Sequence, residues 1–194
     1  MGDAAYHLRF DAGRISLDLV GTVRERLSPR PVDRLADADL LREWLHDTCL
    51  VPADQTAAVD GAWLVEFVAL RELLHRVVHA ELNEAAEPAD LFRLNRTAAV
   101  APPAVRLRRD RDGRLTRRLA GPPRSGAVRS VIARDAIDLL AGADRGLLRE
   151  CEGETCDLVY LDASRGRRRR WCASTACGNR QRVARHRGRL ATAG

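Results

Sequence analysis

Apolar residues recur at intervals of three and four over most of the first 140 residues, a pattern that predicts a mainly helical domain. The pattern is strongest between residues 54 and 83, where it marks the buried stripe of one long helix. Shorter helices are predicted over residues 37–49, 88–98 and 128–140.

Two other segments have a weaker or different pattern. Residues 10–23 fit a short helix better than a strand, although their apolar positions are compatible with both. Between residues 105 and 119, apolar and polar residues alternate on either side of Asp112-Gly113. Alternation around an Asp-Gly pair predicts a β-hairpin.

The helical pattern ends at Gly142, a natural stop for a helix. We place a domain boundary between Gly142 and Gly146, which divides the chain into an N-terminal domain of residues 1–143 and a C-terminal module of residues 144–194. The module combines a short apolar strand, a basic loop and a polar helix over residues 181–190. So small a segment buries little apolar surface of its own.

Four of the five cysteines lie in this module, as two pairs with the spacing Cys-x4-Cys: Cys151, Cys156, Cys172 and Cys177. Each pair can place two thiolates on one tight turn, and two such turns can surround a Zn²⁺ ion with a tetrahedron of sulfur. Four thiolates leave no open position, which indicates a structural ion. The sequence therefore predicts one structural zinc. The predicted fold is α+β and mostly α, a helical N-terminal domain with a β-hairpin followed by a small zinc-binding module.

Two disulfides and a redox-active dithiol are the alternative roles for these cysteines. Disulfides suit an oxidising compartment, but the first ten residues contain no apolar run typical of a secretory signal. No segment has the ~18 apolar residues of a membrane span. We therefore expect a cytoplasmic protein without membrane contact, whose paired cysteines bind metal.

The net positive charge of the chain comes from the C-terminal module. Residues 1–144 hold 21 arginines and 22 acidic residues, whereas residues 145–194 hold 12 arginines and five acidic residues. A Zn²⁺ ion with four thiolates would contribute a charge of about −2, so the module would stay positive. Such a surface suits a polyanion, although a merely solvated charged face is the alternative.

We predict a nucleic-acid surface on the basic loop and the C-terminal helix of the module. Guanidinium groups bind phosphate through two parallel hydrogen bonds, and Asn179 and Arg180 could bond base edges. Alternatively, Asn179 builds the turn after the last cysteine and Arg180 is a structural partner. The predicted set is Arg165, Arg167, Arg168, Arg169, Arg170, Asn179, Arg180, Arg182, Arg185 and Arg189.

His75 and His79 are a second candidate for metal binding, because a spacing of four places both on one face of a helix. With no matching carboxylate motif, we expect them to be exposed histidines. An enzyme in the N-terminal domain would have only these histidines, or Arg14 with Asp18, to work with. The sequence shows no nucleophile, phosphate loop or acid–base group of defined spacing, so we predict that the protein is not an enzyme.

Several unusual motifs follow one another through the module: Cys151-x4-Cys156, Leu-x-Tyr-x-Asp ending at Asp162, Ser-Arg-Gly-Arg-Arg-Arg-Arg-Trp-Cys ending at Cys172, and Cys-Gly-Asn-Arg ending at Arg180. In this order they resemble the CGNR zinc-finger family. Upstream, Gly-Arg-Ile-Ser-Leu-Asp-Leu-Val-Gly-Thr from Gly13 to Thr22 resembles the opening motif of the ABATE domain, which precedes this finger in that family. The family motif usually has Asn where this chain has Gly21.

The resemblance implies a stress-induced transcription regulator, and it implies no enzymatic activity. Together with the charge, it predicts a zinc module that binds DNA and an N-terminal domain that senses a small ligand or dimerises. An apolar cleft in that domain would use Arg14 and Asp18 as charged anchors, and a packed core without a cavity is the alternative. The second hypothesis is a zinc-stabilised adaptor that binds RNA or an acidic protein, and specific DNA binding would distinguish the two.

Overall fold

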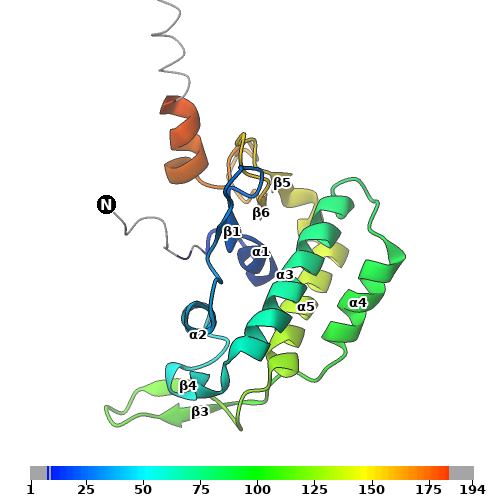
Figure 1. Cartoon of the computed structure of the whole chain (residues 1–194). Coiled ribbons are helices and arrows are strands. Elements are labelled where there is room, and N and C mark those ends of the chain that lie inside the picture. Colours follow the sequence, from blue (N-terminus) through cyan, green and yellow to red (C-terminus); the bar gives the residue numbers. More distant parts are fainter. Residues whose placement is uncertain (1–7, 9, 184–194) are drawn as a thin grey trace, which may run out of the picture.

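The computed structural model describes residue 8 and residues 10–183. Its centre is the long helix α3 (Gly61–Glu81), against which α4 (Pro88–Ala98) and α5 (Ser125–Ala141) pack (Figure 1). The short helix α1 (Ile15–Val20) contacts both α3 and α5, and α2 (Ala38–Asp47) contacts α3. No helix in this part of the chain is both long enough and apolar enough to cross a membrane.

Local signals in the sequence explain where the helices begin. The Asp60 carboxylate accepts hydrogen bonds from the backbone N–H groups of Ala62 and Trp63, at 3.0 and 3.1 Å, and caps α3. The helix therefore begins at Gly61, later than the predicted start at residue 54. The 3₁₀ turn η1 (Ala53–Ala58) occupies the segment before it. Pro88 occupies the start of α4, where a helix needs no N–H donor.

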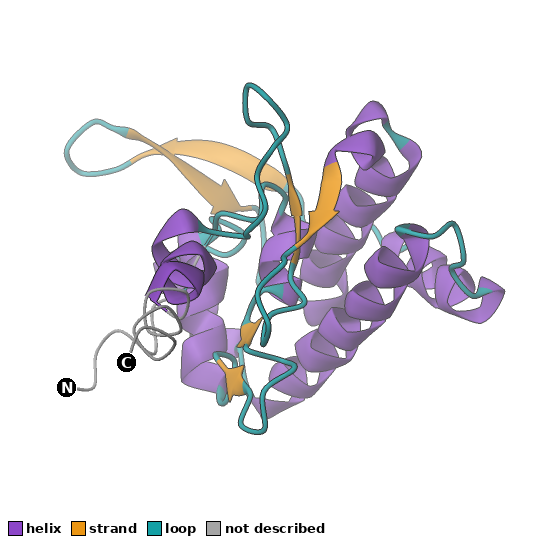
Figure 2. Ribbon diagram, turned by 90° about the horizontal axis from the view of Figure 1, so that it is seen from above, coloured by secondary structure: helices purple, strands orange, loops and turns teal. Residues whose placement is uncertain are grey.

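The strands form three small antiparallel pairs within the described residues (Figure 2). They are β1 (Val23–Arg24) with β2 (Val32–Asp33), β3 (Val105–Arg109) with β4 (Leu115–Leu119), and β5 (Leu148–Glu150) with β6 (Val159–Leu161). The pair β3–β4 is the predicted hairpin, which projects from the helices. The pairing of β5 with β6 was not predicted.

These elements confirm the predicted α+β fold, mostly α, with a hairpin and a C-terminal cysteine module. The helix predicted within residues 10–23 is present but limited to α1. Residues 179–183 are helical, and the rest of the predicted C-terminal helix lies outside the described residues.

The C-terminal module packs onto α1 and shares its core. Buried Leu158, Val159 and Tyr160 belong to the same hydrophobic cluster as the buried residues of α1, α3 and α5. The backbone N–H of Leu161 donates to the carbonyl of Ala12 at 2.9 Å. The module and the helical domain therefore share one hydrophobic core.

Gly13 lies at the tightest point of this junction. Its φ is +96°, a conformation that L side chains rarely adopt, and a Cβ placed there would lie 3.0 Å from Cβ of Leu161. We expect Gly13→Ala to lower the free energy of unfolding by about 1–3 kcal/mol, because it adds backbone strain and a clash. Gly113→Ala is the matched control, since its φ is +78° but no atom lies within 4 Å of the added Cβ. Urea unfolding of both variants should show a larger loss for Gly13→Ala, and equal losses would contradict a tight contact with Leu161.

Candidate metal centre and basic surface

The four predicted ligand cysteines converge on one point. Their sulfur atoms all lie within 4.8 Å of one another, with 3.8 Å between Cys156 and Cys172 and 3.6 Å between Cys172 and Cys177. A tetrahedral zinc site with Zn–S bonds of about 2.3 Å needs sulfur atoms about 3.8 Å apart. All four cysteines are buried, whereas Cys49 is exposed. The donor set and its spacing fit one structural zinc ion.

Backbone contacts bring the two cysteine pairs together. In the first pair, the N–H of Cys151 bonds the carbonyl of Leu158 and the N–H of Cys156 bonds that of Gly153, at 3.0 and 2.9 Å. Gly153 leaves room for the sulfurs, since a Cβ there would lie 3.3 Å from Cβ of Cys156 and 3.4 Å from Sγ of Cys177. The backbone N–H of Cys172 donates to Sγ of Cys151 at 3.3 Å, which joins the second pair to the first.

The thiols titrate as a set. The pKa of Cys151 is lowered because the Cys156 thiol bonds its sulfur, and the same contact raises the pKa of Cys156. A zinc ion would hold all four groups as thiolates and leave the centre negative. Nη2 of Arg180 donates to Sγ of Cys177 at 3.5 Å and offsets part of that charge.

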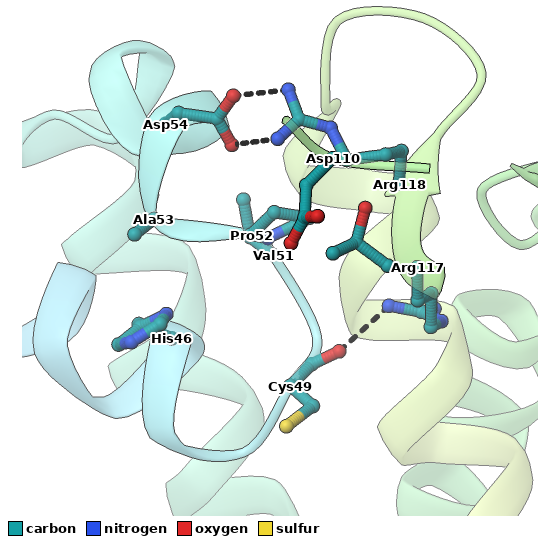
Figure 3. Close-up of a pocket in the computed structure, with 10 residues that line it drawn as sticks. His46, Cys49, Val51, Pro52, Ala53, Asp54, Asp110, Arg117 and Arg118 are labelled. Atoms are coloured by element: carbon teal, nitrogen blue, oxygen red, sulfur yellow. Dashed lines mark hydrogen bonds and ion pairs between the residues drawn. The ribbon is translucent and has the colours of Figure 1, made fainter. Parts of the chain in front are cut away.

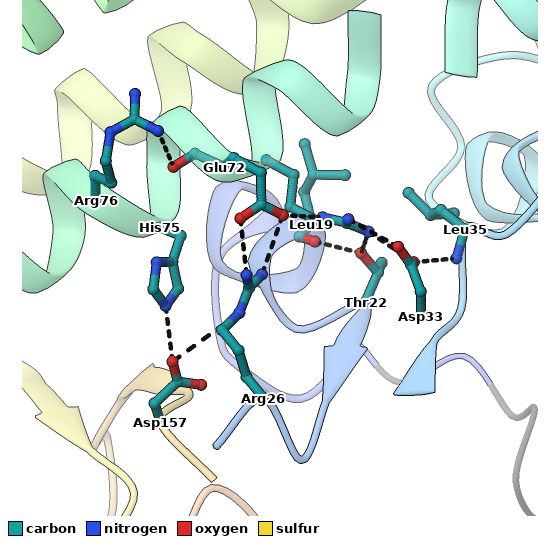
Figure 4. Close-up of polar contacts among 10 residues, drawn as sticks. Leu19, Thr22, Arg26, Asp33, Leu35, Glu72, His75, Arg76 and Asp157 are labelled. Atoms are coloured by element: carbon teal, nitrogen blue, oxygen red, sulfur yellow. Dashed lines mark hydrogen bonds and ion pairs between the residues drawn. The ribbon is translucent and has the colours of Figure 1, made fainter. Parts of the chain in front are cut away.

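The expectation that His75 and His79 are exposed is wrong, because the module partly covers this face of α3. Nε2 of His75 donates to Oδ2 of Asp157 at 2.8 Å (Figure 4). Asp157 directly follows the zinc ligand Cys156 and lies 82 positions from His75 in the sequence. The carboxylate that the helix motif lacks is therefore supplied by the zinc module.

Ion pairs continue from this contact to the loop between α1 and α2 (Figure 4). Arg26 lies 4.0 Å from Asp157 and donates twice to Glu72 on α3, at 2.7 and 3.3 Å. Arg71, only 3% exposed, donates to both oxygens of Asp33 at 2.7 and 2.8 Å. Because Arg71 is buried, loss of Asp33 would leave its charge without this partner, so the network holds the loop on α3.

Asp162 organises the basic loop. Its buried carboxylate accepts hydrogen bonds from the backbone N–H groups of Ser164 and Arg169, both at 3.0 Å. The Tyr160 hydroxyl donates to the carbonyl of Arg169 at 2.6 Å. These bonds give the loop a defined shape between the zinc ligands.

The predicted nucleic-acid residues separate into two groups. Arg169 stacks 4.3 Å above the Tyr160 ring and donates to the carbonyls of Trp171 and Cys172, so it holds the loop together. Arg170 pairs with Glu152 at 2.7 Å and Arg180 pairs with Glu25. Sequence reasoning missed these pairs, because each acidic partner is distant along the chain.

Arg170 and Arg180 are exposed but ion-paired, whereas the second group is exposed without an ion pair among the described residues. Arg165, Arg167, Arg168, Asn179 and Arg182 are exposed, and Arg182 donates to the carbonyl of Ser174 at 3.3 Å. Arg185 and Arg189 lie outside the described residues.

A cavity of about 410 Å³ opens beside the basic loop. Its wall combines arginine, aromatic and hydroxyl side chains with one carboxylate: Asp11, Arg168, Arg169, Arg170, Trp171, Ala173, Ser174 and Thr175. The guanidinium groups of Arg169 and Arg170 are already bonded to loop carbonyls and to Glu152. Exposed Arg168 is therefore the group in this wall best suited to bind an anion.

The predicted ligand anchors Arg14 and Asp18 make polar contacts that hold α1 against its neighbours. Nε of Arg14 lies 2.9 Å from Asp135, and the buried Asp18 carboxylate accepts the N–H of Ala12 at 3.0 Å. Burial is the main cause that raises the pKa of Asp18 to about 6. Neither residue lines any of the four cavities described for this part of the chain, and their role as ligand anchors stays a prediction.

The N-terminal domain does have a cavity, at another place. A hollow of about 430 Å³ lies between η1 and the β3–β4 hairpin (Figure 3). Arg118 pairs with Asp54 across it, and Arg117 donates to the carbonyl of Cys49 at 2.7 Å. Its lining is His46, Cys49, Val51, Pro52, Ala53, Asp54, Asp110, Thr116, Arg117 and Arg118.

Comparison with known families agrees with this arrangement. The model of the ABATE family, described as "Putative stress-induced transcription regulator", matches residues 13–143. The model of the CGNR zinc finger matches residues 148–190, which include all four cysteines. A search of curated proteins found no match.

We expect Cys172→Ser to abolish tight zinc binding and to unfold the module. Structural zinc contributes about 10–16 kcal/mol of apparent binding free energy near neutral pH. Because the module shares its core with α1, the helical domain should keep its helices but unfold at lower urea. After dialysis against a weak chelator, elemental analysis should find one zinc per chain in the parent and in the control Cys49→Ser, and none in Cys172→Ser. A parent protein without zinc after this treatment would contradict the assignment of a four-cysteine zinc site.

Proposed function

We propose that this chain, which belongs to the ABATE family and carries a CGNR zinc finger, regulates transcription by binding DNA through its zinc module. The observation that supports this most is the basic loop, where Arg165, Arg167 and Arg168 are exposed and Arg168 also lines the neighbouring cavity. Exposed guanidinium groups close together on one loop suit the phosphates of a nucleic-acid backbone.

The rigidity of the loop favours such binding. The zinc ligand Cys172 follows the loop, and Asp162 holds its backbone at both ends through Ser164 and Arg169. A pre-organised loop loses less conformational entropy when it binds phosphate. Arg169 acts in this proposal as a positioning residue, because its guanidinium is bonded to the loop's own carbonyls.

Phosphate contacts by the loop would make DNA affinity strongly dependent on salt. With about five contacts in the parent, log K should fall against log salt with a slope of about −4 to −5. Replacing Arg165, Arg167 and Arg168 with Gln should flatten this slope by about 3, because each lost contact removes about 0.9. Fluorescence anisotropy with duplex DNA at several salt concentrations measures both slopes.

The matched control replaces Arg106, Arg108 and Arg111 with Gln. These arginines are exposed in and beside the β3–β4 hairpin, at the end of the molecule opposite the zinc module (Figure 1), and their loss changes the net charge equally. The control should keep the parent slope. No DNA affinity at low salt, or equal slopes for the two triple variants, would refute the proposal, and binding of RNA without duplex DNA would favour the adaptor function.

For the N-terminal domain, we propose that the hollow between η1 and the hairpin receives a small ligand. Its size and the apolar wall of Val51, Pro52 and Ala53 are typical of small-molecule sites. Thr116→Trp should fill the hollow without touching the zinc ligands. Native mass spectrometry of the purified protein should then show a bound small molecule in the parent and none in Thr116→Trp. The same bound mass in both proteins would place the ligand elsewhere.

A further inference from the structure

We propose that His75, His79 and Asp157 form a second metal site, distinct from the four cysteines, which takes a divalent transition-metal ion such as Zn²⁺. Each of the three residues offers a ligand atom, and these atoms lie within 4.8 Å of one another. Two imidazoles and one carboxylate are a donor set that binds Zn²⁺ and leaves one position open. The ligands come from α3 and from the zinc module, so the ion would join the two.

The geometry is close to that of a metal site. His75 and His79 are one helical turn apart, and their rings lie 4.3 Å apart between centroids. The His75–Asp157 contact is 2.8 Å, whereas ligand atoms around a tetrahedral zinc are separated by about 3.3 Å. A small rotation of the side chains would open this contact and admit the ion.

His79 is the residue that distinguishes a metal site from a simple docking contact. Its Nε2 atom is buried and makes no hydrogen bond of good geometry to the described residues, although the backbone of Asp157 lies near the ring. A buried nitrogen without a partner is costly, and coordination to a cation would remove that cost. Burial, and then the charge of His75, lower the pKa of His79, which favours the neutral imidazole that binds metals.

The surrounding charges also permit a cation. Arg26 is the positive group beside Asp157, at 4.0 Å, but both its terminal nitrogens donate to Glu72. Glu72 therefore balances the charge of Arg26, and the Asp157 carboxylate keeps its negative charge for the metal. Both contacts of this carboxylate that the structure describes are made through Oδ2, which leaves Oδ1 for coordination.

The site differs in chemistry from the cysteine centre. Three ligands and an open position allow faster exchange than a closed tetrahedron of thiolates, so the second ion should be lost on dialysis while the first is kept. Occupancy would then follow the concentration of free metal and would tighten the module against α3.

The test titrates the dialysed full-length protein, which retains its cysteine-bound zinc, with Zn²⁺ by calorimetry and with Co²⁺ by absorption. We expect one further equivalent per chain. Bound Co²⁺ should show d–d bands without a thiolate-to-cobalt charge-transfer band, because no sulfur takes part. His79→Gln should weaken this second equivalent by at least about 100-fold, since it removes a ligand outright.

Two further variants complete the design. Asp157→Asn removes the carboxylate ligand but keeps the volume of the side chain. Because His79→Gln leaves the His75–Asp157 hydrogen bond in place, the two variants test the metal site independently. Asp138→Asn, at an exposed carboxylate on α5, is the control and should bind metal like the parent. A parent that takes up no metal beyond its cysteine-bound zinc would overturn the proposal, as would unchanged second-equivalent binding in both His79→Gln and Asp157→Asn.

Discussion

The convergence of four buried sulfur atoms is the constraint on which the C-terminal module depends. Thiolates this close together and this far from water repel one another, and only a cation among them makes the arrangement favourable. The segment between Cys151 and Cys177 holds both the strand β6 and the basic loop. The zinc ion therefore fixes two surfaces at once: the apolar side of β6 that packs on α1, and the exposed arginines of the loop.

Contacts with the helical domain also hold the zinc module in place. Leu158 and Val159 share the core of the helical domain, Leu161 packs on Gly13, and Asp157 pairs with His75 on α3. These contacts join the helical domain to the segment that carries the basic loop.

Net charge is a poor guide to which arginines can bind a polyanion. A guanidinium group carries five donors, and carbonyls or carboxylates that the fold places nearby will satisfy them. Arg169 bonds the carbonyls of its own loop, and Arg180 pairs with Glu25. Arg165, Arg167 and Arg168 differ because the turn between Asp162 and Arg169 carries them outward.

The sequence by itself determined the features that depend on neighbours three to five positions apart. Cysteine spacing predicted the zinc ligands, apolar periodicity predicted α3 to α5, and Asp112-Gly113 predicted the hairpin. Only the tertiary structure decided which distant groups meet. It brought Asp157 to His75, buried Asp18 in the packing of α1, and opened the cavity beside Cys49. Such contacts join segments far apart in the chain, and they follow from how the helices and the zinc module pack together.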